Sequence, residues 1–253
     1  MKKSIFSFRS MALAVGATIL SATFLTACNK FDDDVNDTPV AALMAFNLAT
    51  DKVATPALSG SALTNVPLAY NNYTGAYLNI FPGTRNFEAY DNGSTPFAST
   101  SFSFAPDKYY SAFILGTNGS YRNVVVHDDI DSLPATSAYV RYINAIPDSS
   151  AAVTVKMTAG GTDISNETAA YGSVSAFKAT TATQVSIDVS NGSTIDKDRT
   201  ITIEQGKVYT ILLIGVPGST TTPVDIKFIT NGQLEDEPAG RVSSPGSSSV
   251  RSN

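Results

Sequence analysis

The stretch that decides the fold is TITIEQGKVYTILLIG, residues Thr200 to Gly215, because the chain carries it twice. Residues Ser101 to Gly116 read SFSFAPDKYYSAFILG and place apolar and turn residues at the same positions, 99 residues earlier. Each copy begins with alternating apolar residues, passes through a turn, and continues as a run that is apolar at nearly every position. Alternation predicts a strand with one buried face, and the continuous run predicts a fully buried strand. The sequence therefore predicts two copies of one β-structure.

Tyr110 and Tyr209 open the second strand of each copy. This placement resembles the tyrosine corner of immunoglobulin-like sandwiches, in which the phenol hydrogen-bonds to the backbone of the preceding turn. Each copy offers about seven short strands, and no stretch after the N-terminal segment has helical periodicity over three turns. We therefore predict an all-β protein with two tandem immunoglobulin-like antiparallel β-sandwich domains.

Changes in composition predict the domain boundaries. The expected segments are a lipoprotein signal peptide at 1–27, an acidic tether with the lipidated cysteine at 28–39, sandwich domains at 40–131 and 138–235, a linker at 132–137, and a disordered Ser/Gly-rich tail at 236–253. The short linker contains Pro134, which predicts a restricted hinge. The tail has too few apolar residues to offset the entropy of ordering.

The sequence does not decide which residues point inward in the strands that precede the shared turn NGST. Residues 86–91 precede the turn in the first copy, and residues 185–190 precede it in the second. Aligned on the turn, the inward positions differ by one residue, with Phe87 and Ala89 in one copy and Val185, Ile187 and Val189 in the other. Since one residue of slip moves a side chain to the opposite face, the sequence does not decide this register.

The N-terminus carries an export signal. Basic residues precede an apolar run from Met11 to Leu25, which is too short and too near the start for an ordinary membrane span. The following Leu25-Thr26-Ala27-Cys28 resembles the cleavage box of bacterial lipoproteins, in which the cysteine receives diacylglycerol and an acyl chain. Cys28 is the only cysteine, so it cannot build a disulfide framework. We predict lipidation at Cys28 and hence a membrane anchor.

An acidic cluster, Asp32-Asp33-Asp34, follows the anchor closely. It resembles the export tag that some Gram-negative groups use to send lipoproteins to the outer leaflet of the outer membrane. A solvated tether that keeps the domain off the bilayer explains the same residues, and both explanations stay open. Asn29, rather than Asp, follows Cys28, so the usual inner-membrane retention pattern is absent. We expect an outer-membrane location facing the cell surface or, alternatively, the periplasm.

Three motifs of the second copy carry a family resemblance. They are VRYINAIPDS from Val140, YGSV from Tyr171, and GKVYT from Gly206. They are similar to motifs of the family called domain of unknown function 4397, and the first copy resembles it as a divergent version. The resemblance implies an extracytoplasmic β-sandwich in bacterial surface or secreted proteins, and it implies no activity.

Residues suited to catalysis or metal binding are few. His127 is the only histidine, so a histidine relay or a His/Cys metal set would have to use it. It stands beside Asp128, Asp129 and Asp131, whose carboxylates could hold Ca²⁺ or form a solvated acidic hinge, and we favour the hinge. The formal net charge is −5, which offers no basic face for nucleic acid. We expect no catalytic residue, metal or cofactor.

Tyrosine and asparagine cluster in the first copy between Tyr70 and Tyr77. Aromatic rings and amides are residue types that suit sugar binding. Both ends of this cluster have counterparts, Tyr171 and Phe177, which indicates structural roles, and we place the one extra residue at Tyr73. The candidate ligand contacts are Asn71, Asn72 and Tyr73.

The linker carries a possible modification site. Asp131-Ser132-Leu133 resembles a three-residue acceptor for O-glycosylation of extracytoplasmic proteins in some Gram-negative groups. An exposed linker tolerates a bulky solvating group. Ser132 is therefore a candidate O-glycosylation site, with an unmodified serine as the alternative.

Two functions stay open. The first is a non-catalytic surface module that anchors through its lipid and binds a glycan or another envelope protein. The alternative is a cell-envelope carbohydrate-active hydrolase that uses Asp and Glu residues. We favour the non-catalytic module because no recognised catalytic motif occurs in the sequence and a fold alone does not imply an activity.

Overall fold

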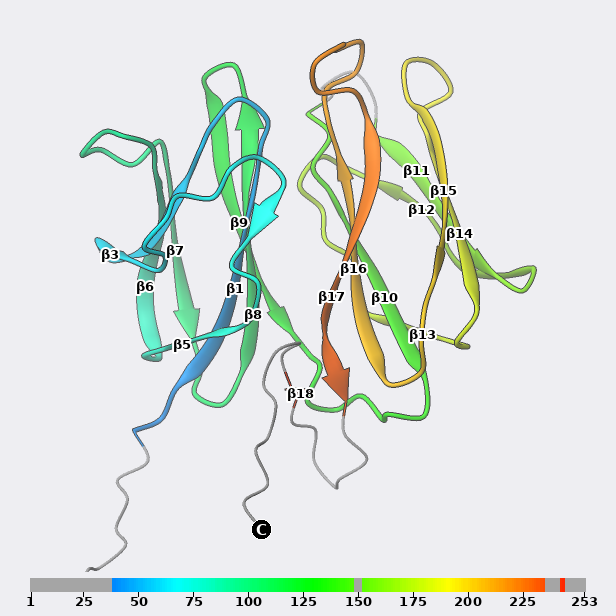
Figure 1. The fold of residues 1–253 in the computed structure, drawn as a ribbon, viewed down its shortest axis with the longest axis horizontal. Coiled ribbons are helices and arrows are strands. Elements are labelled where there is room, and N and C mark those ends of the chain that lie inside the picture. The colour runs from blue at the N-terminus through cyan, green and yellow to red at the C-terminus, as the bar shows by residue number, and fades with distance from the viewer. Residues whose placement is uncertain (1–37, 148–151, 235–241, 244–253) are drawn as a thin grey trace, which may run out of the picture. The chain divides into compact units, whose positions relative to one another are not determined.

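The computed structural model describes residues 38–147, 152–234 and 242–243, which form strands and their connections (Figure 1). The described residues from Pro39 onward belong to one compact unit with two β-rich halves of two sheets each. No helix in these described ranges has the length and apolar character that a membrane crossing needs. The predicted signal peptide, Cys28, the acidic cluster and all of the predicted tail except residues 242–243 lie outside the described residues.

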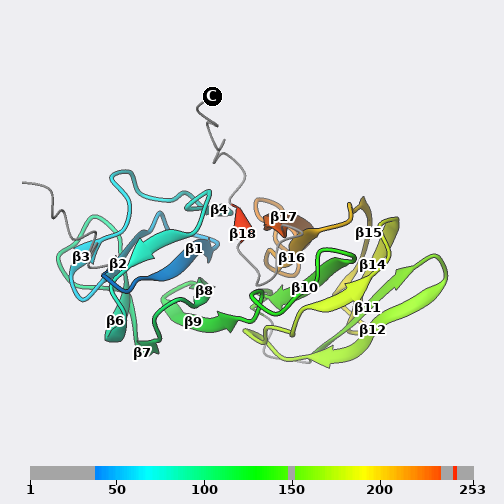
Figure 2. The same cartoon turned by 90° about the horizontal axis from the view of Figure 1, so that it is seen from below.

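The first half has nine strands. They are β1 (Ala41–Ala49), β2 (Thr55–Leu58), β3 (Ser61–Ala62), β4 (Asn72–Tyr73), β5 (Leu78–Ile80), β6 (Gly83–Tyr90), β7 (Ala98–Phe104), β8 (Tyr109–Thr117) and β9 (Ser120–Asp128). One sheet has the order β4-β1-β8-β9, with β5 also paired to β1. The other sheet has the order β3-β2-β6-β7 (Figure 2).

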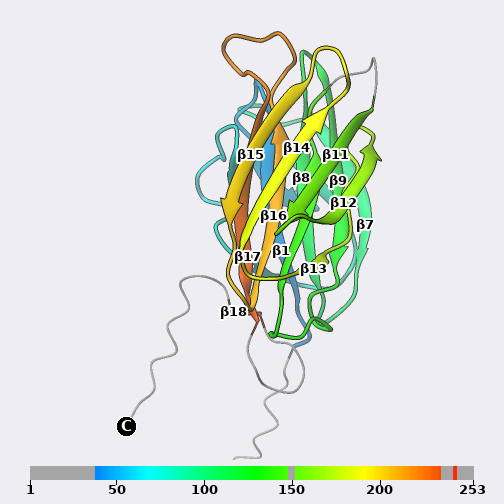
Figure 3. The same ribbon diagram turned by 90° about the vertical axis from the view of Figure 1, so that its right-hand side faces the viewer.

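The second half repeats this plan. Its strands are β10 (Ala138–Asn144), β11 (Val153–Ala159), β12 (Thr162–Ala169), β13 (Lys178–Thr180), β14 (Gln184–Ser190), β15 (Asp196–Thr202), β16 (Lys207–Ile214), β17 (Asp225–Leu234) and β18 (Val242–Ser243). One sheet has the order β13-β10-β16-β17-β18. The other runs β12-β11-β14-β15, and these four strands lie side by side in Figure 3. The all-β class and the two-copy organisation are thus confirmed.

We call the sheet that contains β1 and β8, and its counterpart that contains β10 and β16, the inner sheets of the two halves. Both inner sheets are mixed, which corrects the expectation of purely antiparallel sheets. β1 runs parallel to β8, and β10 runs parallel to β16. Parallel neighbours need a long crossover. The connection is long in both halves, because the chain forms β2 to β7 between β1 and β8, and β11 to β15 between β10 and β16.

Four strands are buried along almost their whole length, namely β1, β8, β10 and β16. One face of each packs in the core of its own half, as Leu43 of β1 does. The opposite face, which includes Phe46 of β1, packs in a cluster shared with the other half. A strand buried on both faces needs apolar residues at successive positions, which explains the continuous apolar runs of the sequence.

The register left open by the sequence is the same in both halves. Phe87 pairs with Thr100, and Ile187 pairs with Arg199. Thr100 and Arg199 are repeat counterparts, 99 residues apart. Phe87 therefore corresponds to Ile187, and both side chains are fully buried. The one-residue difference lies in the turn that follows each strand.

Each half has one buried tyrosine that closes a turn. The hydroxyl of Tyr110 accepts the backbone N–H of Ala105 at 2.8 Å, and the hydroxyl of Tyr209 accepts that of Glu204 at 3.1 Å. Both tyrosines are buried in the core of their own half. These bonds fasten the turns that lead into β8 and β16.

The segment between the halves packs on a small buried cluster. Ile130 is fully buried and shares this cluster with Tyr139, Val208 and Leu234. The hydroxyl of Tyr139 also donates to the carbonyl of Pro134 at 3.0 Å. These contacts restrain the connection at both of its ends.

Candidate functional site

The inner sheets of the two halves contact each other through a shared apolar cluster, which we call the seam. Its buried members are Met44, Phe46, Leu48, Phe113, Leu115, Ile143, Ala145, Leu212 and Ile214. The rings of Phe46 and Phe113 stack with centroids 4.8 Å apart. The seam buries residues from β1, β8, β10 and β16, so it joins the two halves as a core would.

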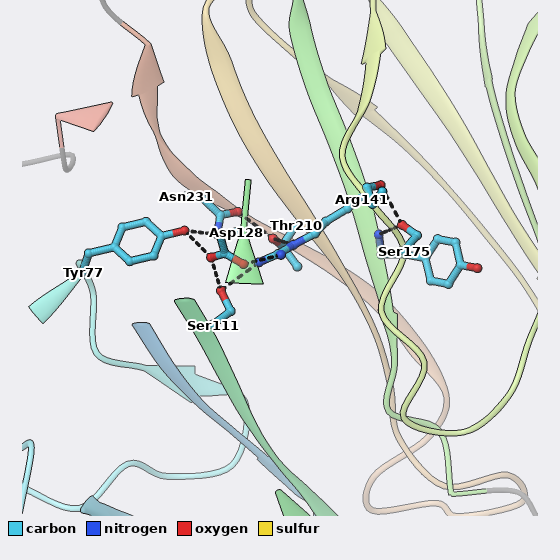
Figure 4. A network of polar contacts seen from close by, with 9 residues as sticks. Tyr77, Ser111, Asp128, Arg141, Ser175, Thr210 and Asn231 are labelled. Carbon is cyan, nitrogen blue, oxygen red and sulfur yellow. Dashed lines mark hydrogen bonds and ion pairs between the residues drawn. The ribbon is translucent and has the colours of Figure 1, made fainter. Parts of the chain in front are cut away.

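One cation lies inside the seam. Arg141 of β10 is 2% exposed, and its Nη1 donates to Oδ1 of the fully buried Asp128 of β9 at 2.5 Å (Figure 4). Its Nη2 donates to Ser111 Oγ at 2.8 Å, and its Nε donates to Thr210 Oγ1 at 3.0 Å. The guanidinium of the second half is therefore bonded to both halves at once.

The carboxylate of Asp128 has two further donors. The hydroxyls of Tyr77 and Ser111 both donate to its Oδ2 at 2.6 Å. Asn231 of β17 completes the network, because it accepts from Thr210 at 2.6 Å and donates to the Tyr77 oxygen at 3.3 Å. Burial, reinforced by the charge of Asp128, raises the pKa of the Tyr77 phenol well above its usual value, so this phenol stays protonated as a donor.

The acidic run after β9 is not one solvated unit. Asp128 is fully buried, Asp131 pairs with Lys108 at 2.8 Å, and Asp129 is exposed. The prediction of a solvated acidic hinge is therefore wrong for Asp128, because its carboxylate has a buried guanidinium partner. Within ranges 38–147 and 152–234, no group of three or more His, Cys, Asp or Glu residues is placed to hold a metal ion.

The side chain of Arg141 also packs against aromatic rings. Its guanidinium carbon lies 4.2 Å from the ring centroid of Phe177 and 5.9 Å from that of Phe113. A planar guanidinium stacks well on such rings, which lowers its cost of burial. Phe177 thus helps to hold the cation in the orientation that reaches Asp128.

Two loops flank the seam at equivalent places, residues 70–77 in the first half and 171–177 in the second. In the first, Thr74 Oγ1 accepts a backbone N–H of β1, and in the second, Ser175 Oγ accepts one of β10. Thr74 is therefore the counterpart of Ser175. The extra residue of the first loop follows Thr74 and is Gly75, whose φ of 82° suits glycine.

This equivalence corrects the sequence alignment, which placed the extra residue at Tyr73. Tyr73 corresponds instead to Val174, and its ring stacks on Phe46 with centroids 5.4 Å apart. Of the two predicted asparagine contacts, Asn72 is exposed and Asn71 is half-buried with a positive φ of 66°. Tyr73 thus contributes to the seam as well as to the loop surface.

A pocket of about 290 Å³ opens beside the second loop and the linker. Its lining includes Val126, Asp129, Ser132, Arg141, Val174 and Phe177. Ser132, the candidate glycosylation site, is exposed and belongs to this lining. His127 also lines the pocket, and its ring lies 5.4 Å from that of Tyr110.

The polar network was not predicted, although the sequence carries a signal for it. Arg141 interrupts an apolar strand, and Ser111 and Thr210 interrupt the two apolar runs at equivalent repeat positions. A buried polar side chain requires a hydrogen-bonding partner. Polar residues at matching positions of two buried strands therefore indicate a shared network between those strands.

The fold and the seam define an all-β repeat protein whose two halves are joined by a buried polar network. The chain matches the family model described as Domain of unknown function (DUF4397) twice, over residues 41–156 and 138–243, and it belongs to that family. The two matches overlap in the part that contains β10 and the start of β11. No curated protein matches the chain.

Proposed function

We propose that the protein is a lipid-anchored, non-catalytic binding module of the cell envelope, held at the outer membrane and facing the cell surface. Its partner is a glycan or another envelope protein. The observation that supports this most directly is the box Leu25-Thr26-Ala27-Cys28, which lies shortly before the folded unit. The 12 residues from Asn29 to Val40 reach at most roughly 40 Å when extended, so the lipid would keep the folded unit close to the membrane.

The seam supports a binding role rather than catalysis. The guanidinium of Arg141 and the carboxylate of Asp128 bond to each other and to neighbouring hydroxyls, and this joins the two halves. A rigid scaffold loses little entropy when it binds a ligand, so a fused pair of sandwiches suits a binding module.

We also propose that each half is an immunoglobulin-like sandwich. Each half has two sheets, and Tyr110 and Tyr209 bond to the backbone five residues earlier, as a tyrosine corner does. The parallel pairs β1–β8 and β10–β16 distinguish these halves from a sandwich of purely antiparallel sheets.

The anchor is tested by replacing Cys28. In its native host, the wild-type chain is expected in the outer-membrane fraction, labelled with palmitate and cleaved by protease added to intact cells. Cys28→Ala should lose the label and leave the membrane, while Ser132→Ala, which keeps the box intact, should behave as wild type. Normal processing and membrane partition of Cys28→Ala would contradict the proposal, and sugar release from envelope glycans by the purified protein would favour a hydrolase instead.

Ser132 is proposed as an O-glycosylation site on separate grounds. Its side chain is exposed in a linker that is restrained by the packing of Ile130 and Tyr139, so an enzyme can reach it without unfolding either half. Intact-mass measurement of protein from the native host should show a glycan that Ser132→Ala lacks. Equal masses, apart from the lost oxygen atom, would contradict this site.

A further inference from the structure

The loops 70–77 and 171–177 cover the two sides of the seam at equivalent places, but they contribute side chains of different size there. On the first side, Tyr73 stacks in the seam and Tyr77 reaches Asn231 of β17. On the second side, Val174 and Phe177 stand at the equivalent positions. Valine is much smaller than tyrosine, and phenylalanine lacks the hydroxyl. The pocket lies on this second side, where the aromatic filling is reduced.

The size and position of the pocket restrict its occupant. Its volume of about 290 Å³ is at the lower end of the range of small-molecule sites, which gives room for a ligand of about one ring. Asp129 and Ser132 are exposed in its lining, so the pocket is open to solvent. A free ring, or a ring at the end of a longer chain, can therefore enter.

The walls combine apolar and hydrogen-bonding groups. The ring of Phe177 and the side chains of Val126 and Val174 supply apolar surface, while the exposed carboxylate of Asp129 supplies hydrogen-bond acceptors. Such a combination suits a ligand that has hydroxyl groups on its rim and a C–H face.

The charges of the lining disfavour an anion. Arg141 contributes a guanidinium to this lining, and the carboxylate of Asp128 balances its charge at 2.5 Å. Asp129 then leaves a negative balance. We propose that this pocket binds one neutral sugar residue, either free or at the end of a glycan. The inference rests on the proposed binding function and names the ligand class of that function.

The test uses the full-length protein in a non-glycosidic detergent, because a sugar-based detergent would compete. The protein comes from a host that leaves Ser132 unmodified, as checked by intact mass. Calorimetric titration with neutral monosaccharides, and with oligosaccharides that end in the same residues, should detect binding. A tighter oligosaccharide identifies a glycan end as the source, and equal affinities identify the free sugar.

Two pocket variants and one control locate the binding. Val174→Tyr restores the aromatic residue of the first half and should weaken binding at least about tenfold by closing the pocket. Asp129→Asn alters an exposed carboxylate without disturbing the seam and should also weaken binding about tenfold. Asn72→Ala removes a candidate contact that the sequence predicted in the first loop, and it should leave affinity unchanged because Asn72 does not line the pocket.

Three outcomes decide the proposal. Loss of affinity in both pocket variants with an unchanged Asn72→Ala supports it. Unchanged affinity in Asp129→Asn together with loss in Asn72→Ala overturns it and places the sugar on the first loop. No binding of any neutral sugar by the wild-type protein also overturns it, whereas palmitate labelling of Cys28 and pull-down of an envelope protein test the proposed function independently.

Discussion

β1 and β10 occupy equivalent places, yet they meet the seam with different side chains. Met44 of β1 pairs with Ser111, and Arg141 of β10 pairs with Thr210, the repeat counterpart of Ser111. The carboxylate that balances Arg141 comes from the first half, at Asp128. Two copies of either charge would repel each other inside the seam. The two repeats therefore fit together because their side chains at the seam are complementary, not because they are identical.

The largest effect is expected from making β10 resemble β1. Arg141→Met leaves the buried carboxylate of Asp128 without its partner, and the free energy of unfolding should fall by about 3–5 kcal/mol. Urea denaturation followed by circular dichroism measures this change. The double variant Arg141→Met with Asp128→Asn should recover most of the loss, because it removes both charges. A single variant within about 0.5 kcal/mol of wild type would show that the pair does not stabilise the seam.

A smaller effect tests what the two halves have in common. Tyr110→Phe and Tyr209→Phe each remove the acceptor of one backbone N–H and should each cost about 1–3 kcal/mol of unfolding free energy. The control is Tyr121→Phe, whose exposed hydroxyl donates to Asp51 and should cost no more than about 0.5 kcal/mol. Equal losses in the two corner variants would show that the repeats use the same device. Losses no larger than that of the control would reject the corners.

The smallest effect on the free energy of unfolding is expected in the loops, where Tyr77 of the first half has a hydroxyl that its counterpart Phe177 lacks. Burial raises the pKa of Tyr77 above its usual value of 10.0 in the folded protein. The stability that the neutral phenol contributes is therefore complete below about pH 10 and is lost as the pH rises toward the raised folded pKa. Tyr77→Phe, which copies Phe177, should reduce the alkaline decline of unfolding free energy by up to about 1.4 kcal/mol per pH unit.

Urea titrations between pH 8 and pH 11 measure this slope. Other half-buried phenols contribute to it as well, since burial raises the pKa of Tyr70 to about 12. The variant should therefore keep part of the decline. Identical slopes for wild type and Tyr77→Phe would show that the network does not depend on the protonated phenol.

The repeated strands could be predicted from the sequence because the spacing of their apolar residues follows from which of their faces are buried. The runs of β8 and β16 are apolar at successive positions, and this follows from burial on both faces. The parallel pairing of β1 with β8 could not be predicted in the same way, because a fully buried strand shows the same apolar run beside a parallel or an antiparallel neighbour.

The candidate site was harder to predict because its parts lie in both halves. Asp128 reads as one of several acidic residues after a strand, and only the position of Arg141 explains its burial. Likewise, the extra residue could not be assigned to Gly75 from one sequence, because the hydrogen bonds of Thr74 and Ser175 define the equivalence. Both features depend on tertiary contacts that local pattern does not contain.

The shared seam indicates that the two repeats fold as one unit. Differential scanning calorimetry of the full-length protein tests it most directly, through the ratio of the calorimetric to the van't Hoff enthalpy of unfolding. A seam that joins the halves predicts a single transition in which the two enthalpies are equal. Two transitions, or a calorimetric enthalpy about twice the van't Hoff value, would show that each repeat unfolds alone and would contradict the claim.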